Sequence, residues 1–175
     1  NEWDLGVGWP PCDLTGLESL AGLDILRITF FDPSMELTWT SVGAPLEQLV
    51  LYSYPSVELP LVSSSTLQRL WVSDAPQLTT LPALPIGLRN LMVEFAPSFA
   101  ALPAIPNTVD SLVMNSTGLV SLAIPELSDA QVVSDLNEQL ESVDLGTGVN
   151  SVSIYYSPLL SEFVVGADCK SIVIS

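Results

Sequence analysis

The 175-residue chain contains no histidine, only two cysteines and only four basic side chains. The absence of histidine removes the usual general base at neutral pH and the Ser-His catalytic pairs. Two isolated cysteines cannot build a structural zinc site, and no glycine-rich loop is followed by a lysine in the phosphate-binding pattern. The sequence therefore predicts a protein that is not an enzyme and that uses no cofactor or metal ion.

Acidic side chains outnumber basic ones by 20 to 4, which gives a formal net charge of −16. Such a surface repels phosphate backbones, so we expect no nucleic-acid partner. No run approaches the roughly 18 uninterrupted apolar residues of a membrane span, so we expect no membrane insertion. We interpret the acidity as a source of solubility for a chain that is 48% hydrophobic, with attraction to a basic partner or to cations as the alternative.

The two cysteines lie near opposite ends of the chain, at Cys12 and Cys169. If stacked coils separate them at about 4.8 Å per strand, they lie on the order of 30 Å apart. A disulfide tolerates about 7 Å between Cα atoms, so no internal bridge is expected. Each cysteine is interpreted as a small buried residue, and the redox compartment stays open.

What the chain does contain is a repeat of the form Leu-x-x-Leu-x-φ, where φ is apolar. The second leucine of this unit recurs every 21 residues, at Leu49, Leu70, Leu91 and Leu112. Each unit is too short to bury its own apolar face, so neighbouring units must stack to form a core. The second leucine and φ are two residues apart and point to the same side of a short strand, which predicts inward-facing columns.

The same pattern extends toward both ends of the chain, with one ambiguous stretch. We expect residues 1–22 to form an N-terminal cap or a partial coil and residues 23–175 to form the repeats, the last of them truncated. Between repeats, Ala130–Val132 is favoured as the next strand over Val133–Asp135, which would bury an acid. A short helix over Ser128–Leu140, with Ser128 as its cap, is the alternative.

Prolines mark the far side of two successive units, at Leu81–Pro85 and Leu102–Pro106. Proline fixes φ and lacks a backbone donor, so these segments are not expected to be ladder strands. An extended, polyproline-like return is predicted instead.

With these prolines, the units Leu67–Pro85 and Leu88–Pro106 resemble the short bacterial type of leucine-rich repeat. The resemblance implies a curved right-handed solenoid, α/β-type or mainly β, of about seven to eight coils. It implies parallel strands on the concave face and extended segments on the convex face. It also implies a secreted or cell-surface bacterial protein involved in adhesion or host interaction.

The chain departs from that family at one position. The family usually places an asparagine three residues past φ, where its side chain bonds backbone groups between coils. By this count the chain has Tyr54, Ala75, Ala96 and Thr117.

Outward-facing residues of the predicted strands form a surface whose composition is typical of protein recognition. Aromatic residues, methionine and arginine dominate binding hot spots. The candidate partner-binding residues are Arg27, Val50, Tyr52, Arg69, Trp71, Asn90, Met92, Glu94 and Val113. The alternatives are that these are ordinary scattered surface residues, or that a slipped register places Trp71 in the core.

The leading functional hypothesis is a non-catalytic module that binds a protein across the concave sheet, with a glycan as the second choice of partner. The alternative hypothesis is a structural spacer or self-assembling stalk without a specific ligand. In that case the final strand near Ile172–Ser175 would pair with a second copy of the chain.

Overall fold

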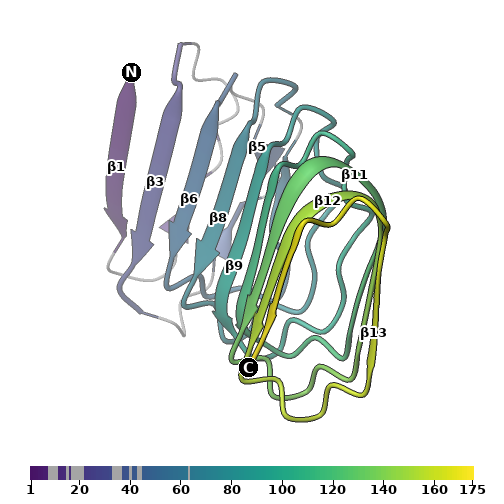
Figure 1. Ribbon diagram of the computed structural model, residues 1–175. Coiled ribbons are helices and arrows are strands. Elements are labelled where there is room, and N and C mark those ends of the chain that lie inside the picture. The colour runs from purple at the N-terminus through teal and green to yellow at the C-terminus, as the bar shows by residue number, and fades with distance from the viewer. Residues whose placement is uncertain are drawn as a thin grey trace.

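The computed structural model describes residues 1–7, 12–14, 16, 22–32, 37–39, 41–42, 45–62 and 64–175. It is a β-solenoid in which the strands of successive coils lie side by side in parallel (Figure 1). The described residues contain no helix, so of the two predicted classes the mainly β one holds and the α/β one does not.

Among the described residues, one long sheet runs through the stack and two small sheets lie in the N-terminal coils. The long sheet is built from β1 (Glu2–Val7), β3 (Ile25–Phe30), β6 (Gln48–Tyr52), β8 (Arg69–Ser73), β9 (Asn90–Ala96), β10 (Ser111–Thr117), β11 (Ser121–Asp135), β12 (Ser142–Tyr155), β13 (Glu162–Val165) and β14 (Ser171–Ile174). The small sheets pair β2 (Cys12–Asp13) with β4 (Leu37–Thr38), and β5 (Ser41–Val42) with β7 (Leu61–Val62).

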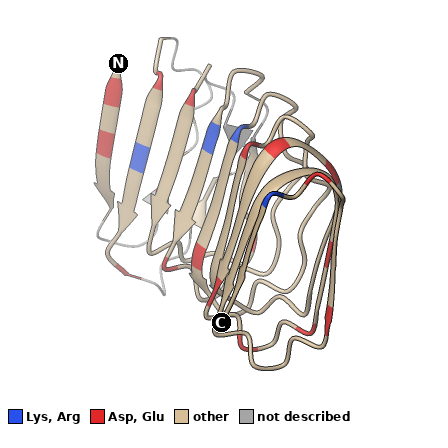
Figure 2. Ribbon diagram, in the orientation of Figure 1, with Lys and Arg blue, Asp and Glu red and all other residues tan. Residues whose placement is uncertain are grey.

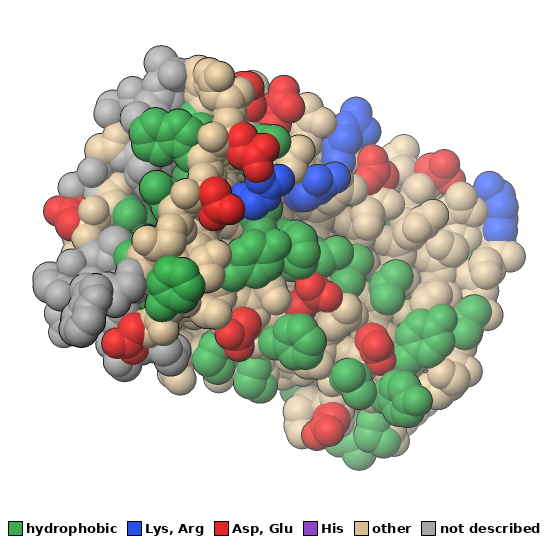
Figure 3. All heavy atoms as spheres, turned by 90° about the vertical axis from the view of Figure 1, so that its left-hand side faces the viewer, with side chains coloured by type: hydrophobic (Ala, Val, Ile, Leu, Met, Phe, Trp, Pro, Cys, Tyr) green, Lys and Arg blue, Asp and Glu red, His purple; other side chains and the backbone are tan. Residues whose placement is uncertain are grey.

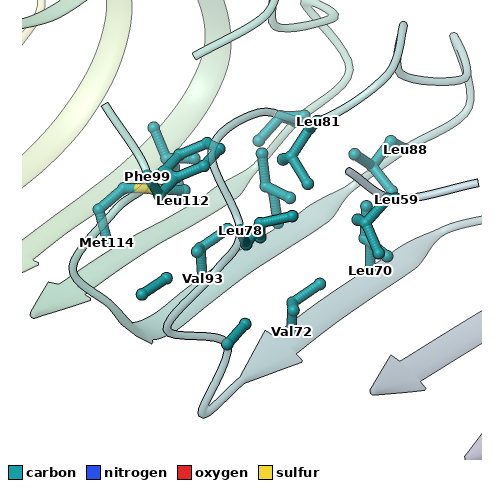
Figure 4. Packing of buried hydrophobic residues seen from close by; sticks show 14 of the residues in the cluster. Leu59, Leu70, Val72, Leu78, Leu81, Leu88, Val93, Phe99, Leu112 and Met114 are labelled. Carbon is teal, nitrogen blue, oxygen red and sulfur yellow. The ribbon is translucent and has the colours of Figure 1, made fainter. Parts of the chain in front are cut away.

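The four repeat leucines form one column, as predicted. Leu49 pairs with Leu70, Leu70 with Leu91, and Leu91 with Leu112, and all four side chains are fully buried. Along β8, β9 and β10, inward side chains are buried and the residues between them are more exposed; β8 alternates in this way from Arg69 to Ser73. Figure 4 shows Leu112 beside Phe99, and Leu70 beside Leu88, inside the coils.

After β10 the repeat shortens from 21 to 20 residues, since Leu112 pairs with Val132 and Val132 pairs with Val152. The preference for Ala130–Val132 was right about which side chains face inward, because both are buried. It was wrong about position, because Val132 takes the place of the repeat leucine and Ser134 takes the place of φ. The alternative helix over Ser128–Leu140 is also wrong, since β11 covers its first half.

The returning segments differ between the two halves of the molecule. Leu81–Pro85 and Leu102–Pro106 belong to no strand, as the prolines predicted. From Ser121 onward the returning segments are strands: the first halves of β11 and β12 form a ladder with β13. In this part buried Leu122 and Ile124 alternate with exposed neighbours, which is the period of a strand.

β11 and β12 therefore bend around a corner and belong to both sides of the coil (Figure 1). The pairing register shifts between Glu126 and Gln131, where the two strands turn from the returning side of the coil to the side that continues the ladder of β10. Gly148 lies at this corner with φ of +77°, a left-handed conformation that favours glycine.

Asn137 joins two adjacent coils through its buried side-chain amide. Its Oδ1 accepts hydrogen bonds from the amide nitrogen and the hydroxyl of Thr117, both at 2.7 Å. Its Nδ2 donates to the carbonyl of Met114 and to the hydroxyl of Ser134, both at 2.6 Å. Counted from the corrected position of Ser134, Asn137 stands three residues past φ. One coil therefore carries the inter-coil asparagine that the sequence count had missed.

In the other coils, different residues take this position. Tyr54 is buried, donates its hydroxyl to the carbonyl of Glu58 at 2.8 Å, and packs edge-on against Phe30. Burial raises the pKa of Tyr54 above its ordinary value of 10.0, with a smaller opposing effect from a hydrogen bond to Ser56. The hydroxyl therefore stays protonated as a donor at neutral pH.

The N-terminal segment begins with a strand of the same sheet, since Trp3 pairs with Leu26 and Leu5 with Ile28. Most of the rest of residues 8–21, including the spaced leucines Leu17 and Leu20, lies outside the described residues. At the other end Cys169 is a free, half-buried thiol. The side chain of Cys12 is not among those described.

Candidate functional site

The predicted outward residues lie in register on the outer face of the long sheet. In the central row, Arg27 pairs with Val50, then come Trp71, Met92 and Val113 on successive strands. Figure 3 looks onto this face and shows a band of hydrophobic side chains across it, with basic side chains along its upper border. The alternation of strand residues thus brings side chains 21 residues apart together on one surface.

Trp71 faces outward and is half-buried, so the slipped register that would place it in the core is excluded. Its ring packs edge-to-face against Tyr52, with ring centroids 5.2 Å apart and planes at 71°. Aromatic pairs prefer this geometry because the positive ring edge meets the negative face. The two rings form a rigid apolar ledge on β6 and β8.

Glu94 fixes the indole of Trp71 from the next strand. Its Oε2 accepts a hydrogen bond from Trp71 Nε1 at 3.0 Å, and its Oε1 accepts one from Asn115 Nδ2 at 3.0 Å. Glu94 is therefore half-buried and holds two neighbours in place.

Val50 was predicted to be available to a partner, and this is wrong. It faces outward in the central row, yet it is only 2% exposed. The long side chains of Arg27 and Trp71 flank it on the two neighbouring strands. Val50 therefore packs between these two longer side chains and offers almost no surface to a partner.

A hollow of about 300 Å³ opens on this face, lined by Arg69, Trp71, Asn90, Met92 and Ser111. Arg69 donates from its guanidinium to Gln48 Oε1 at 3.0 Å. Asn90 donates from Nδ2 to Asp110 Oδ1 at 2.9 Å. The hollow therefore combines an apolar wall with polar side chains that neighbouring residues hold in position.

Apart from the buried Val50, the predicted site residues fall into three groups. Arg69, Trp71, Asn90 and Met92 surround the hollow, while Tyr52 and Glu94 support Trp71 from either side. Val113 and Arg27 lie in the same row outside the hollow, and Arg27 is ion-paired with Glu2.

Two residues of the face were not among the predicted site residues. Ser111 lines the hollow and Asn115 holds Glu94. The repeat could have identified them, because Ser111 and Asn115 stand one repeat after Asn90 and Glu94 respectively.

A second, larger hollow of about 680 Å³ lies at the C-terminal end of the stack. Its apolar lining includes Leu136, Ile154, Tyr156, Leu160 and Ile174. All of β14 is exposed, and β14 pairs only with β12. This hollow is the open end of the core rather than part of the outer face.

Acidic side chains on the described surface are dispersed rather than gathered into a metal site. Figure 2 shows acidic residues spread over the coils and basic ones within strands or just before them. Within the described ranges, no cluster of three or more His, Cys, Asp or Glu side chains could hold a metal ion. None of the described segments forms a helix long and apolar enough to cross a membrane. Comparisons with protein-family models, with curated proteins and with solved structures found no match.

Proposed function

We propose that this chain is a non-catalytic recognition module that binds a protein partner through the outer face of its long sheet. The observation that carries the proposal is the hollow beside the Tyr52–Trp71 ledge. Glu94 and Gln48 hold Trp71 and Arg69 in fixed orientations, which lowers the entropy lost when a partner docks.

A protein is favoured over a glycan because Trp, Tyr, Met and Arg are the residues that dominate protein hot spots. A glycan remains the second candidate ligand, since the same ledge offers an aromatic ring beside polar groups. We propose neither a cofactor nor a nucleic-acid partner, given the net charge of −16. By resemblance, we place the protein in a secreted or cell-surface setting.

We further propose that the solenoid is of the leucine-rich repeat type. Two features support this: the repeat leucines form one buried column, and Asn137 makes the inter-coil amide bonds that the family's asparagine makes. The absence of strands at Leu81–Pro85 and Leu102–Pro106 agrees with the short bacterial form.

The test replaces both apolar wall residues, Trp71→Ala with Met92→Ala. The double variant should keep its cooperative thermal unfolding and lose at least about 2 kcal/mol of binding free energy, as expected for a hot-spot anchor. Immobilised wild type, this variant and Val164→Ala, which alters an exposed valine on β13, are compared for proteins retained from an extract of the native cells. A protein retained by wild type and the control but lost from the double variant supports the proposal. Retention that ignores Trp71 and Met92, or unfolding of the double variant, contradicts it.

A structural role is the second candidate, and the exposed C-terminal strand favours it. Ile172, Val173 and Ile174 are each exposed by 41–51%, on an edge strand whose backbone can pair with another chain. This role predicts concentration-dependent oligomers in sedimentation velocity, and Val173→Lys should abolish them. A wild type that stays monomeric at millimolar concentration would rule this candidate out.

A further inference from the structure

Among the residues that the structure describes, the hollow on the outer face contains the one arginine that forms no ion pair with an acid. We propose that Arg69 binds a carboxylate side chain of the partner, with the apolar part of that side chain lying against Trp71 and Met92. This inference rests on the proposed function and names the chemistry of its contact.

The charges of the other arginines are already compensated. Arg27 forms an ion pair with Glu2, and Arg89 lies 3.5 Å from Asp110. Among the described side chains, Arg69 has no carboxylate within ion-pair distance, and its printed partner is the neutral amide of Gln48. An uncompensated cation on a chain of net charge −16 is therefore confined to this hollow and to Lys170 near the C-terminus.

The geometry leaves Arg69 able to bind. A guanidinium carries five N–H donors, and the bond to Gln48 uses one of them. The side chain is exposed, so the remaining donors are open to a ligand. Carboxylates bind guanidinium groups through two parallel hydrogen bonds, which are stronger than bonds between neutral groups. Gln48 thus orients the group without neutralising it.

The acids that border the hollow are already engaged. Both oxygens of Glu94 accept hydrogen bonds, from Trp71 and from Asn115. Both oxygens of Asp110 accept as well, from Asn90 and from Arg89. These carboxylates are held by their own donors, so they do not compete for the free donors of Arg69. Their negative charge also repels a carboxylate of the partner at every position in the hollow except beside Arg69.

The size of the hollow fits one side chain of a partner. Its volume of about 300 Å³ lies at the lower limit of sites for whole small molecules. Trp71 and Met92 offer apolar contact to the methylene groups of a glutamate, while Asn90 and Ser111 add polar groups at the rim. A glutamate on a partner's surface meets both requirements.

The experiment titrates the intact ¹⁵N-labelled chain with N-acetyl-glutamate amide and with its neutral isostere, N-acetyl-glutamine amide. The reporter is the indole N–H signal of Trp71, assigned with Trp71→Phe. The glutamate probe should shift this signal saturably, and the glutamine probe should bind at least about tenfold more weakly, as expected for loss of a charged hydrogen bond. Arg69→Gln should remove the difference between the probes, whereas the matched control Arg89→Gln should preserve it.

Equal binding of the two probes, no binding of either, or a preference that survives Arg69→Gln would each overturn the carboxylate site. These outcomes are separate from the capture test with Trp71→Ala and Met92→Ala. If capture depends on those residues but the probes do not discriminate, the recognition face stands and the carboxylate assignment fails. If the probes discriminate but nothing is captured, the proposed function fails.

Discussion

Replacing Asn137 with alanine is expected to lower the free energy of unfolding by about 3 kcal/mol or more. The substitution leaves the amide and hydroxyl of Thr117 without their acceptor and the carbonyl of Met114 without this donor. Asn137 and Thr117 are both buried, so water cannot replace these bonds without opening the stack. Each buried polar group left unpaired costs about 1–3 kcal/mol.

The matched control is Asn150→Ala. Asn150 likewise donates from its Nδ2 to the preceding coil, to Asp129 Oδ1 at 2.7 Å, but this bond is exposed. Its loss should change stability by no more than about 0.5 kcal/mol. Urea unfolding followed by circular dichroism compares the two variants, and equal losses would show that burial of the Asn137 amide does not decide its contribution.

The repeat itself made much of the fold predictable. A leucine every 21 residues, with an apolar residue two positions later, requires both side chains to point inward and successive units to stack. Leu49, Leu70, Leu91 and Leu112 do so. The prolines at Leu81–Pro85 likewise predicted a return without a ladder, because proline lacks the donor that a ladder needs.

The sequence misled at the coil after β10, because polar side chains there occupy inward positions. Ser134 stands where φ should be apolar, and it is buried because Asn137 donates a hydrogen bond to it. A search for apolar pairs therefore placed the pattern two residues too early, on Ala130 and Val132. The same error hid Asn137 from the family's asparagine position, since that position is counted from φ.

The sequence predicted which residues lie on the outer face, but not which of them are exposed or where the face is hollow. Alternation predicted that Trp71, Met92 and Glu94 would face out together, and they do. Whether an outward residue is open depends on the side chains of neighbouring strands, which alternation does not specify. Val50 is covered, and a hollow opens one strand further on, beside Trp71.

The corner of β12 provides the other large expected effect. Gly148→Ala should lower the free energy of unfolding by about 3–5 kcal/mol, which is in the range of the most damaging single substitutions. A Cβ built on Gly148 would lie 1.7 Å from the carbonyl oxygen of Leu127 and 2.5 Å from its carbonyl carbon. Both atoms are backbone, so no side-chain rotation relieves the contact. The coils must separate where Ala130 pairs with Val149, and this disrupts the ladder.

Gly22→Ala separates this clash from backbone strain. Gly22 has φ of +79°, close to the +77° of Gly148, but within the described part of the chain only Asn1 Nδ2 lies near its built Cβ, at 3.8 Å. A left-handed alanine costs about 1–2 kcal/mol, so Gly22→Ala should lose that amount and no more. Thermal and urea unfolding of both variants measure the difference. Similar losses for the two variants would mean that the left-handed backbone conformation alone requires glycine at position 148. A larger loss for Gly148→Ala would mean that glycine is required because two coils approach closely there. This close approach lets β11 and β12 turn onto the outer face together.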